Sequence, residues 1–100
     1  MEPGYIYALI NPSLEGLVKI GKTARDPKTR AADLSSATGV PTPFILAYEE
    51  HFTDITAAET FLHTLLKEKG HQISDSREFF DVDLKDAIMA IQSAKESFST

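Results

Sequence analysis

The chain has 100 residues, a formal net charge of −5 at pH 7, 42% hydrophobic residues and 25% charged residues. This length and balance predict one compact globular domain over residues 1–100 and argue against wholesale disorder. The sequence contains no cysteine, which excludes disulfides, thiolate metal sites and cysteine nucleophiles. The first residues do not resemble a secretion signal, and no apolar run approaches the about 20 residues of a membrane span, so we expect a cytoplasmic protein.

Positive charge is concentrated in one segment of this acidic chain. Residues 1–48 contain five Lys or Arg and four Asp or Glu, whereas residues 49–100 contain five and eleven. The five basic residues of the first half all lie in one short stretch: Lys19, Lys22, Arg25, Lys28 and Arg30. Such a cluster is either a solvated face, which is the commoner case, or a phosphate-binding patch on an acidic body. The net charge disfavours a generic, strongly basic nucleic-acid-binding protein.

The first half of the sequence predicts a β-hairpin followed by a helix. Residues 4–10 alternate and are rich in Tyr and Ile, which is typical of a strand, and Asn11-Pro12 with Gly16 marks a turn. Residues 17–23 form the second predicted strand, and the short connection favours antiparallel pairing. Asp26 and Pro27 then provide an N-cap and a first helical residue for a helix that ends before Gly39.

The second half predicts a strand, a helix, a short extended segment and a last helix. Residues 44–52 read as the strand, and residues 54–70 carry apolar side chains at helical spacing. Residues 77–82 are a short strand or an extended loop, and Asp83 caps a helix that continues to Phe98. This order predicts an α+β fold, in which helices pack on a small antiparallel sheet.

Four short motifs now appear in order along the chain. They are "YIY" at Tyr5 to Tyr7, "KIGKT" at Lys19 to Thr23, "AETFLH" at Ala58 to His63 and "REFF" at Arg77 to Phe80, with Arg30 and Leu34 between the second and the third. Together they resemble the GIY-YIG nuclease superfamily, and more narrowly its divergent T5orf172, or Mug113-like, branch. The resemblance covers about residues 4 to 91. It implies a three-stranded antiparallel sheet flanked by helices and metal-dependent cleavage of DNA phosphodiester bonds.

The resemblance also implies roles for individual residues. Tyr7 matches the tyrosine of the first motif, Arg30 the helix arginine that contacts phosphate, and Glu59 the carboxylate that holds Mg²⁺ or Mn²⁺. Tyr5 and Gly21 belong to the structural motifs. Lys19 occupies the place of the second motif's tyrosine, as it tends to do in the narrower branch.

Some of these residues also have roles that need no resemblance. His63 lies one helical turn after Glu59 and is either an acid, a base or an ordinary exposed residue. Phosphate contacts are expected from Lys22, Arg25, Lys28 and Arg30, although an arginine of this kind more often pairs with a nearby carboxylate. A tyrosine such as Tyr7 can exchange a proton with attacking water or simply be a half-buried strand residue.

Glu59 has a specific structural alternative. The spacing of Thr56 and Glu59 matches a capping box, in which Glu59 caps its own helix. Asp54 is a rival cap that would leave the Glu59 carboxylate available for a metal ion. The sequence leaves both arrangements open.

Three functions therefore remain open. The first is a DNA endonuclease that uses Mg²⁺ or Mn²⁺ and acts on double-stranded or structured DNA, with specificity that is low or supplied by a protein partner. The second is a DNA-binding module of the same fold without turnover, which Lys19 favours. The third is a protein-interaction domain that uses the acidic C-terminal half.

Overall fold

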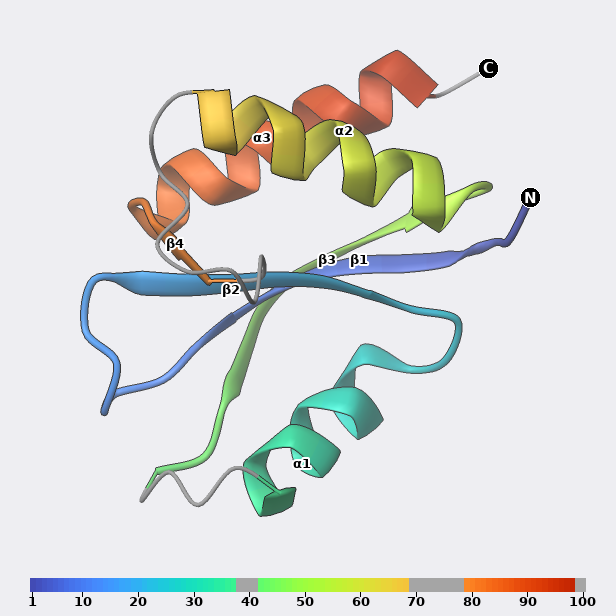
Figure 1. Ribbon diagram of the computed structural model, residues 1–100. Helices are drawn as coiled ribbons and strands as arrows, with labels where there is room; N and C mark the ends of the chain where they lie inside the picture. The colour runs from blue at the N-terminus through green and yellow to red at the C-terminus, as the bar shows by residue number, and fades with distance from the viewer. Residues whose placement is uncertain (38–41, 69–78, 99–100) are drawn as a thin grey trace.

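The computed structural model describes residues 1–37, 42–68 and 79–98. Within these described residues, three helices and four strands follow one another in an α+β arrangement, as predicted (Figure 1). In chain order they are β1 (Gly4–Ile10), β2 (Leu17–Thr23), α1 (Pro27–Ala37), β3 (Ile45–Phe52), α2 (Ile55–Glu68), β4 (Phe79–Asp81) and α3 (Leu84–Phe98). Among the described residues, no helix combines the length and the apolar character needed to cross a bilayer.

As far as the structure describes the chain, the sheet has four antiparallel strands in the order β3-β1-β2-β4. The resemblance implied three strands, so the observed sheet has one strand more than expected. The additional strand, β4, pairs with the first three residues of β2, so that Val18 lies opposite Phe80. This pairing places the Phe80 side chain, which is fully buried, in the main core. Arg77 and Glu78 of the "REFF" motif lie outside the described residues.

The β1–β2 hairpin closes through a turn that needs glycine and a buried amide. Gly16 has a φ of 79°, a left-handed conformation that side chains with a Cβ adopt at a cost. Asn11 is 4% exposed. Its Nδ2 donates to the Thr42 carbonyl at 2.9 Å, and its Oδ1 accepts from the Ser13 N–H at 2.8 Å. One side chain thus ties the hairpin loop to the residues that precede β3.

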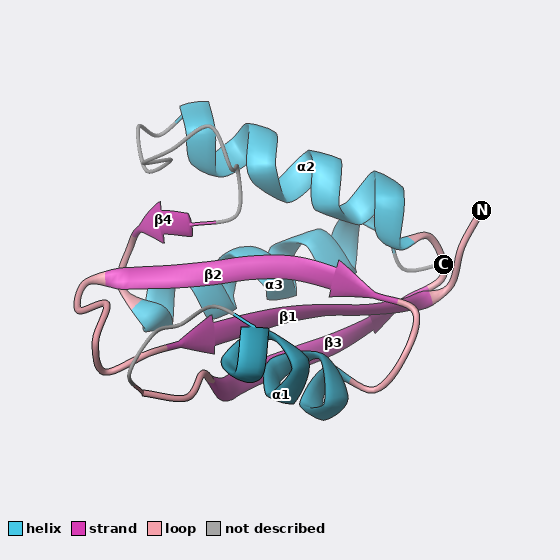
Figure 2. Ribbon diagram, turned by 60° about the horizontal axis from the view of Figure 1, so that its bottom comes forward, coloured by secondary structure: helices cyan, strands magenta, loops and turns pink. Residues whose placement is uncertain are grey.

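Helices cover both faces of the sheet. Figure 2 shows α2 and α3 on one side and α1 on the other. Because side chains alternate along a strand, β1 contributes to two cores. Ile6 and Ala8 pack in the larger cluster with α2 and α3, whereas Tyr7 and Leu9 pack in a smaller cluster with Ala31 of α1.

Two aspartates set the starts of α1 and α2: Asp26, which was predicted as a cap, and Asp54, which was one of two alternatives. Asp26 Oδ1 accepts from the Lys28 N–H at 3.1 Å, and Pro27 is the first residue of α1. Asp54 Oδ1 accepts from the Ala57 N–H at 3.3 Å. Asp54 therefore caps α2, and the rival capping box is not needed.

Candidate functional site

A basic depression lies where β2 ends and α1 begins. It is lined by Lys22, Thr23, Ala24, Arg25, Thr29, Arg30 and Asp33, and its volume is about 280 Å³. Its three basic side chains and one carboxylate give it a net charge of +2, in a chain whose formal net charge is −5. The depression therefore concentrates positive charge on an acidic protein.

The backbone of this depression is held by local hydrogen bonds and by a close strand contact. The Thr23 hydroxyl accepts from the Arg25 N–H at 3.1 Å, and Asp26 fixes the first turn of α1. Gly4 lies against the same turn, since a Cβ built on it would be 2.5 Å from the Thr23 carbonyl oxygen. Only glycine permits this approach without a shift of the backbone.

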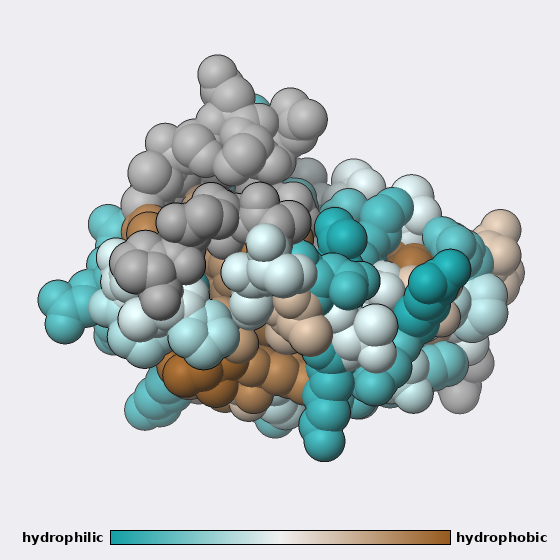
Figure 3. Space-filling model, turned by 90° about the horizontal axis from the view of Figure 1, so that it is seen from below, coloured by the Kyte–Doolittle hydropathy of each residue, from teal (hydrophilic) through white to brown (hydrophobic). Residues whose placement is uncertain are grey.

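Lys28 and Lys19 lie outside the basic depression. Lys28 is exposed on α1 and lines a separate hollow between α1 and the start of β3, with Phe44 and Leu46. Figure 3, which looks at the α1 side, shows apolar surface there beside hydrophilic side chains. Lys19 is 6% exposed, and its Nζ lies 5.0 Å from the centroid of the Phe79 ring. The depression thus gathers three of the five basic residues of this segment.

The alternation of side chains along β2 explains why Lys19 and Lys22 lie in different places. Lys19 and Lys22 are three positions apart on β2, and residues an odd number of positions apart point to opposite faces of a sheet. Lys19 accordingly packs over Phe79, which belongs to the cluster on the α1 side. Lys22 instead reaches α2, where its Nζ donates to the Thr56 hydroxyl at 3.1 Å.

Glu59 lies beside Lys22. Its Oε1 is 3.8 Å from the Lys22 Nζ, and the two side chains are 21% and 34% exposed. Because Asp54 caps α2, the Glu59 carboxylate does not cap its own helix. Lys22 therefore connects this carboxylate on α2 with the basic depression at the end of β2.

The two tyrosines of the first motif lie on the other face of the sheet from Glu59. Tyr7 is 1% exposed, pairs with Gly21 across the hairpin and packs in the α1 cluster. Tyr5 is half-buried, with its ring edge-on to His51 at 5.4 Å between centroids. The sheet thus separates Tyr7 from Glu59, and the structure does not bring them together at one surface.

His63 stabilises the edge of the sheet. Its Nε2 lies within hydrogen-bond distance, 3.2 Å, of the Ile20 carbonyl, and its ring centroid is 5.2 Å from that of Phe80. Among the described residues, β4 pairs with Leu17 to Lys19 of β2, and His63 contacts the carbonyl of the next β2 residue. This contact orients the imidazole toward the strand.

The donor set near Glu59 is small. Within the described residues, no three His, Cys, Asp or Glu side chains come together as a metal-binding group. Mg²⁺ is often held by only one or two carboxylates, with water and phosphate oxygens in the other positions. Glu59 therefore fits a hard divalent cation as its one protein ligand, provided that the cation also contacts phosphate.

Gly4 and Thr56 take part in this site, although neither was predicted from the sequence to belong to it. A glycine inside a strand pattern is a known signal of close backbone approach, and Gly4 carries that signal. The sequence marked Thr56 only as a possible helix cap and gave no signal of its contact with Lys22, which joins residues 34 positions apart.

Comparison with known proteins identifies the family. A family model described as the T5orf172 domain matches residues 4–95, which is most of the chain. No curated protein and no solved structure matches the chain. The match spans every strand and helix from β1 to most of α3, including both elements that form the basic depression. The chain therefore belongs to the T5orf172 domain family, which is associated with nuclease-like folds of the GIY-YIG type.

Proposed function

We propose that this protein binds DNA by contacting backbone phosphates in the basic depression. The observation that carries the proposal is the convergence of Lys22, Arg25 and Arg30 on one depression. Guanidinium groups grip two phosphate oxygens at once, and a lysine adds a third donor group. Membership of the family supports a nuclease-like or DNA-binding module.

The test is the salt dependence of DNA binding. Each phosphate contact contributes about 0.9 to the slope of log K against log salt concentration. Replacing Arg25 and Arg30 by Gln should therefore lower the slope by about 1.8, so that the variant loses about 12-fold less affinity between 50 and 200 mM salt than the wild type. Fluorescence anisotropy with a labelled duplex and a labelled single strand measures this slope and shows which form is preferred.

A matched control removes the same charge elsewhere. Lys67 and Lys85 are exposed on α2 and α3. Lys67→Gln with Lys85→Gln should leave the slope close to that of the wild type. Equal slopes for the wild type and the Arg25→Gln, Arg30→Gln variant would contradict phosphate contact in the depression.

A second candidate is metal-dependent hydrolysis of phosphodiester bonds, and the half-buried position of Glu59 beside Lys22 favours it. Glu59 would hold Mg²⁺ or Mn²⁺, and such an ion supplies a polarised phosphate and an activated water. In this proposal Lys22 and Arg30 bind the phosphate. Tyr7 and Lys19 are buried and His63 contacts the Ile20 carbonyl, so this proposal gives none of them a direct contact with the phosphate.

Nicking of supercoiled plasmid in Mg²⁺ or Mn²⁺ distinguishes the two candidates. Glu59→Ala should abolish nicking and leave the fold intact, because Asp54 and not Glu59 caps α2. Glu68→Ala, which removes an exposed carboxylate from the same helix, serves as the control. Equal nicking by wild type and Glu59→Ala would indicate a contaminant, and DNA binding without nicking would favour the binding module.

A further inference from the structure

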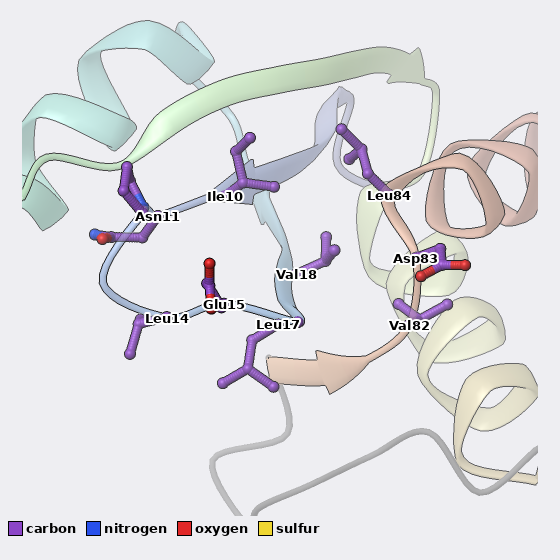
Figure 4. A pocket seen from close by; sticks show the side chains of 11 residues that line it. Ile10, Asn11, Leu14, Glu15, Leu17, Val18, Val82, Asp83 and Leu84 are labelled. Atoms are coloured by element: carbon purple, nitrogen blue, oxygen red, sulfur yellow. The ribbon is translucent and has the colours of Figure 1, made fainter.

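A second pocket lies at the opposite end of β2 from the basic depression. Its volume is about 340 Å³, and it is formed by the end of β1, the hairpin turn, the start of β2 and the segment between β4 and α3 (Figure 4). Leu17 and Val18 line this pocket, whereas Lys22 and Thr23 line the basic depression. A strand of seven residues spans about 20 Å, so one molecule can occupy each site independently.

The lining of this hairpin pocket combines an apolar wall with carboxylates. Figure 4 shows Ile10, Val18 and Leu84 around the opening, with the Glu15 carboxylate directed toward the space between them. Asp83 lies at the rim, next to Leu84. None of the eleven lining residues is Lys, Arg or His. In the part of the chain that the structure describes, neither Glu15 nor Asp83 forms an ion pair.

We infer that the hairpin pocket receives a lysine or arginine side chain from a basic segment of a partner protein. The stems of these side chains pack along apolar surface, while their charged heads remain at a polar edge. Ile10, Val18 and Leu84 provide the apolar surface, and Glu15 and Asp83 provide the complementary charge. A nucleic acid would bring its phosphates against both carboxylates, which disfavours it here.

The experiment uses the full chain, labelled with ¹⁵N, and a simple mimic of the side chain. Hexylammonium chloride should shift the amide signals of residues 15–18 and 82–84. Sodium hexanoate, which has a similar apolar stem and the opposite charge, should shift them far less. A ten-residue peptide with a Leu-Lys-Ile core should bind the same amides, and the peptide with Glu in place of that Lys should not.

Variants locate the contact. Glu15→Gln and Asp83→Asn should each weaken binding of the Lys peptide about threefold, as expected for a partly exposed ion pair. Glu49→Gln, which removes an exposed carboxylate from β3, should leave binding unchanged, and so should the Arg25→Gln, Arg30→Gln variant. Three results would overturn the inference: equal shifts with hexylammonium and hexanoate, shifts confined to other residues, or binding of hexylammonium without binding of the Lys peptide.

Discussion

Replacing Gly4 by Ala should destabilise the fold at the edge of the basic depression. The new Cβ would lie 2.5 Å from the Thr23 carbonyl oxygen, 3.0 Å from the Ala24 Cα and 3.1 Å from the Ile55 Cδ1. Two of these neighbours are backbone atoms and cannot rotate away. The methyl group therefore forces β1 away from the turn that follows β2.

The expected magnitude is the difference between two effects. Overpacking in a well-packed region costs about 1–3 kcal/mol. Losing glycine also removes conformational freedom from the unfolded chain, which stabilises the fold by about 0.4–1 kcal/mol. The free energy of unfolding should therefore fall by about 1–2 kcal/mol, which lowers the Tm of a domain of this size by roughly 4–16 °C.

Urea denaturation followed by circular dichroism measures the change in the free energy of unfolding. Gly16→Ala is a useful comparison, since its φ of 79° predicts strain of about 1–2 kcal/mol without any atom within 4 Å of the new Cβ. Only Gly4→Ala should also shift the amide signals of Thr23 to Arg25. A Gly4→Ala protein as stable as the wild type would refute the steric argument.

Two further predictions concern the cap of α2 and the alkaline limit of stability. Asp54→Ala should cost about 1 kcal/mol of unfolding free energy through loss of the N-cap, and Thr56→Ala should cost less; a larger loss for Thr56→Ala in urea denaturation would instead support the capping box. Burial, followed by the 2.7 Å hydrogen bond to Glu50, raises the pKa of Tyr48 above its ordinary 10.0. The unfolded chain therefore releases this proton first, so stability is retained below about pH 10 and lost above it. Tyr48→Phe should lose less stability than the wild type between about pH 9 and pH 11, and parallel losses would contradict this.

The sequence predicted the order of elements because the patterns that define them are local. Alternation in β1, helical spacing in α2 and the cap at Asp26 depend only on neighbouring residues. The pairing of β4 was not predictable in the same way. This strand has three residues, too few for a pattern, and its position depends on burying Phe80 in the main core, opposite Val18 of β2 and beside His63 of α2.

The candidate site was harder to predict, because it depends on which face of an element each side chain occupies. Lys19 and Lys22 were assigned to one basic segment because they are close in the sequence. The alternation of side chains along a strand already places them on opposite faces of the sheet. The sequence could not distinguish a cap by Asp54 from the capping box, since both match the spacing of a helix start. Only the hydrogen bond from Ala57 to Asp54 decides it.

Lys22 couples the two halves of the site, and this coupling has a measurable consequence. Its ion pair with Glu59 is 3.8 Å long and partly exposed, so it contributes little to stability. A DNA phosphate can therefore attract Lys22 at small cost. In the proposed complex the Glu59 carboxylate would face the phosphate without its counter-charge, and a divalent cation would relieve that repulsion.

We therefore expect Ca²⁺ or Mg²⁺ to raise the DNA affinity of the wild type at constant ionic strength. Glu59→Gln has nearly the same shape but no charge, so its DNA affinity should be higher without the cation and should not rise when the cation is added. Anisotropy titrations with and without the cation measure both effects, and Glu68→Gln on the same helix is the control. An equal cation effect in wild type and Glu59→Gln would mean that Glu59 does not face the bound phosphate.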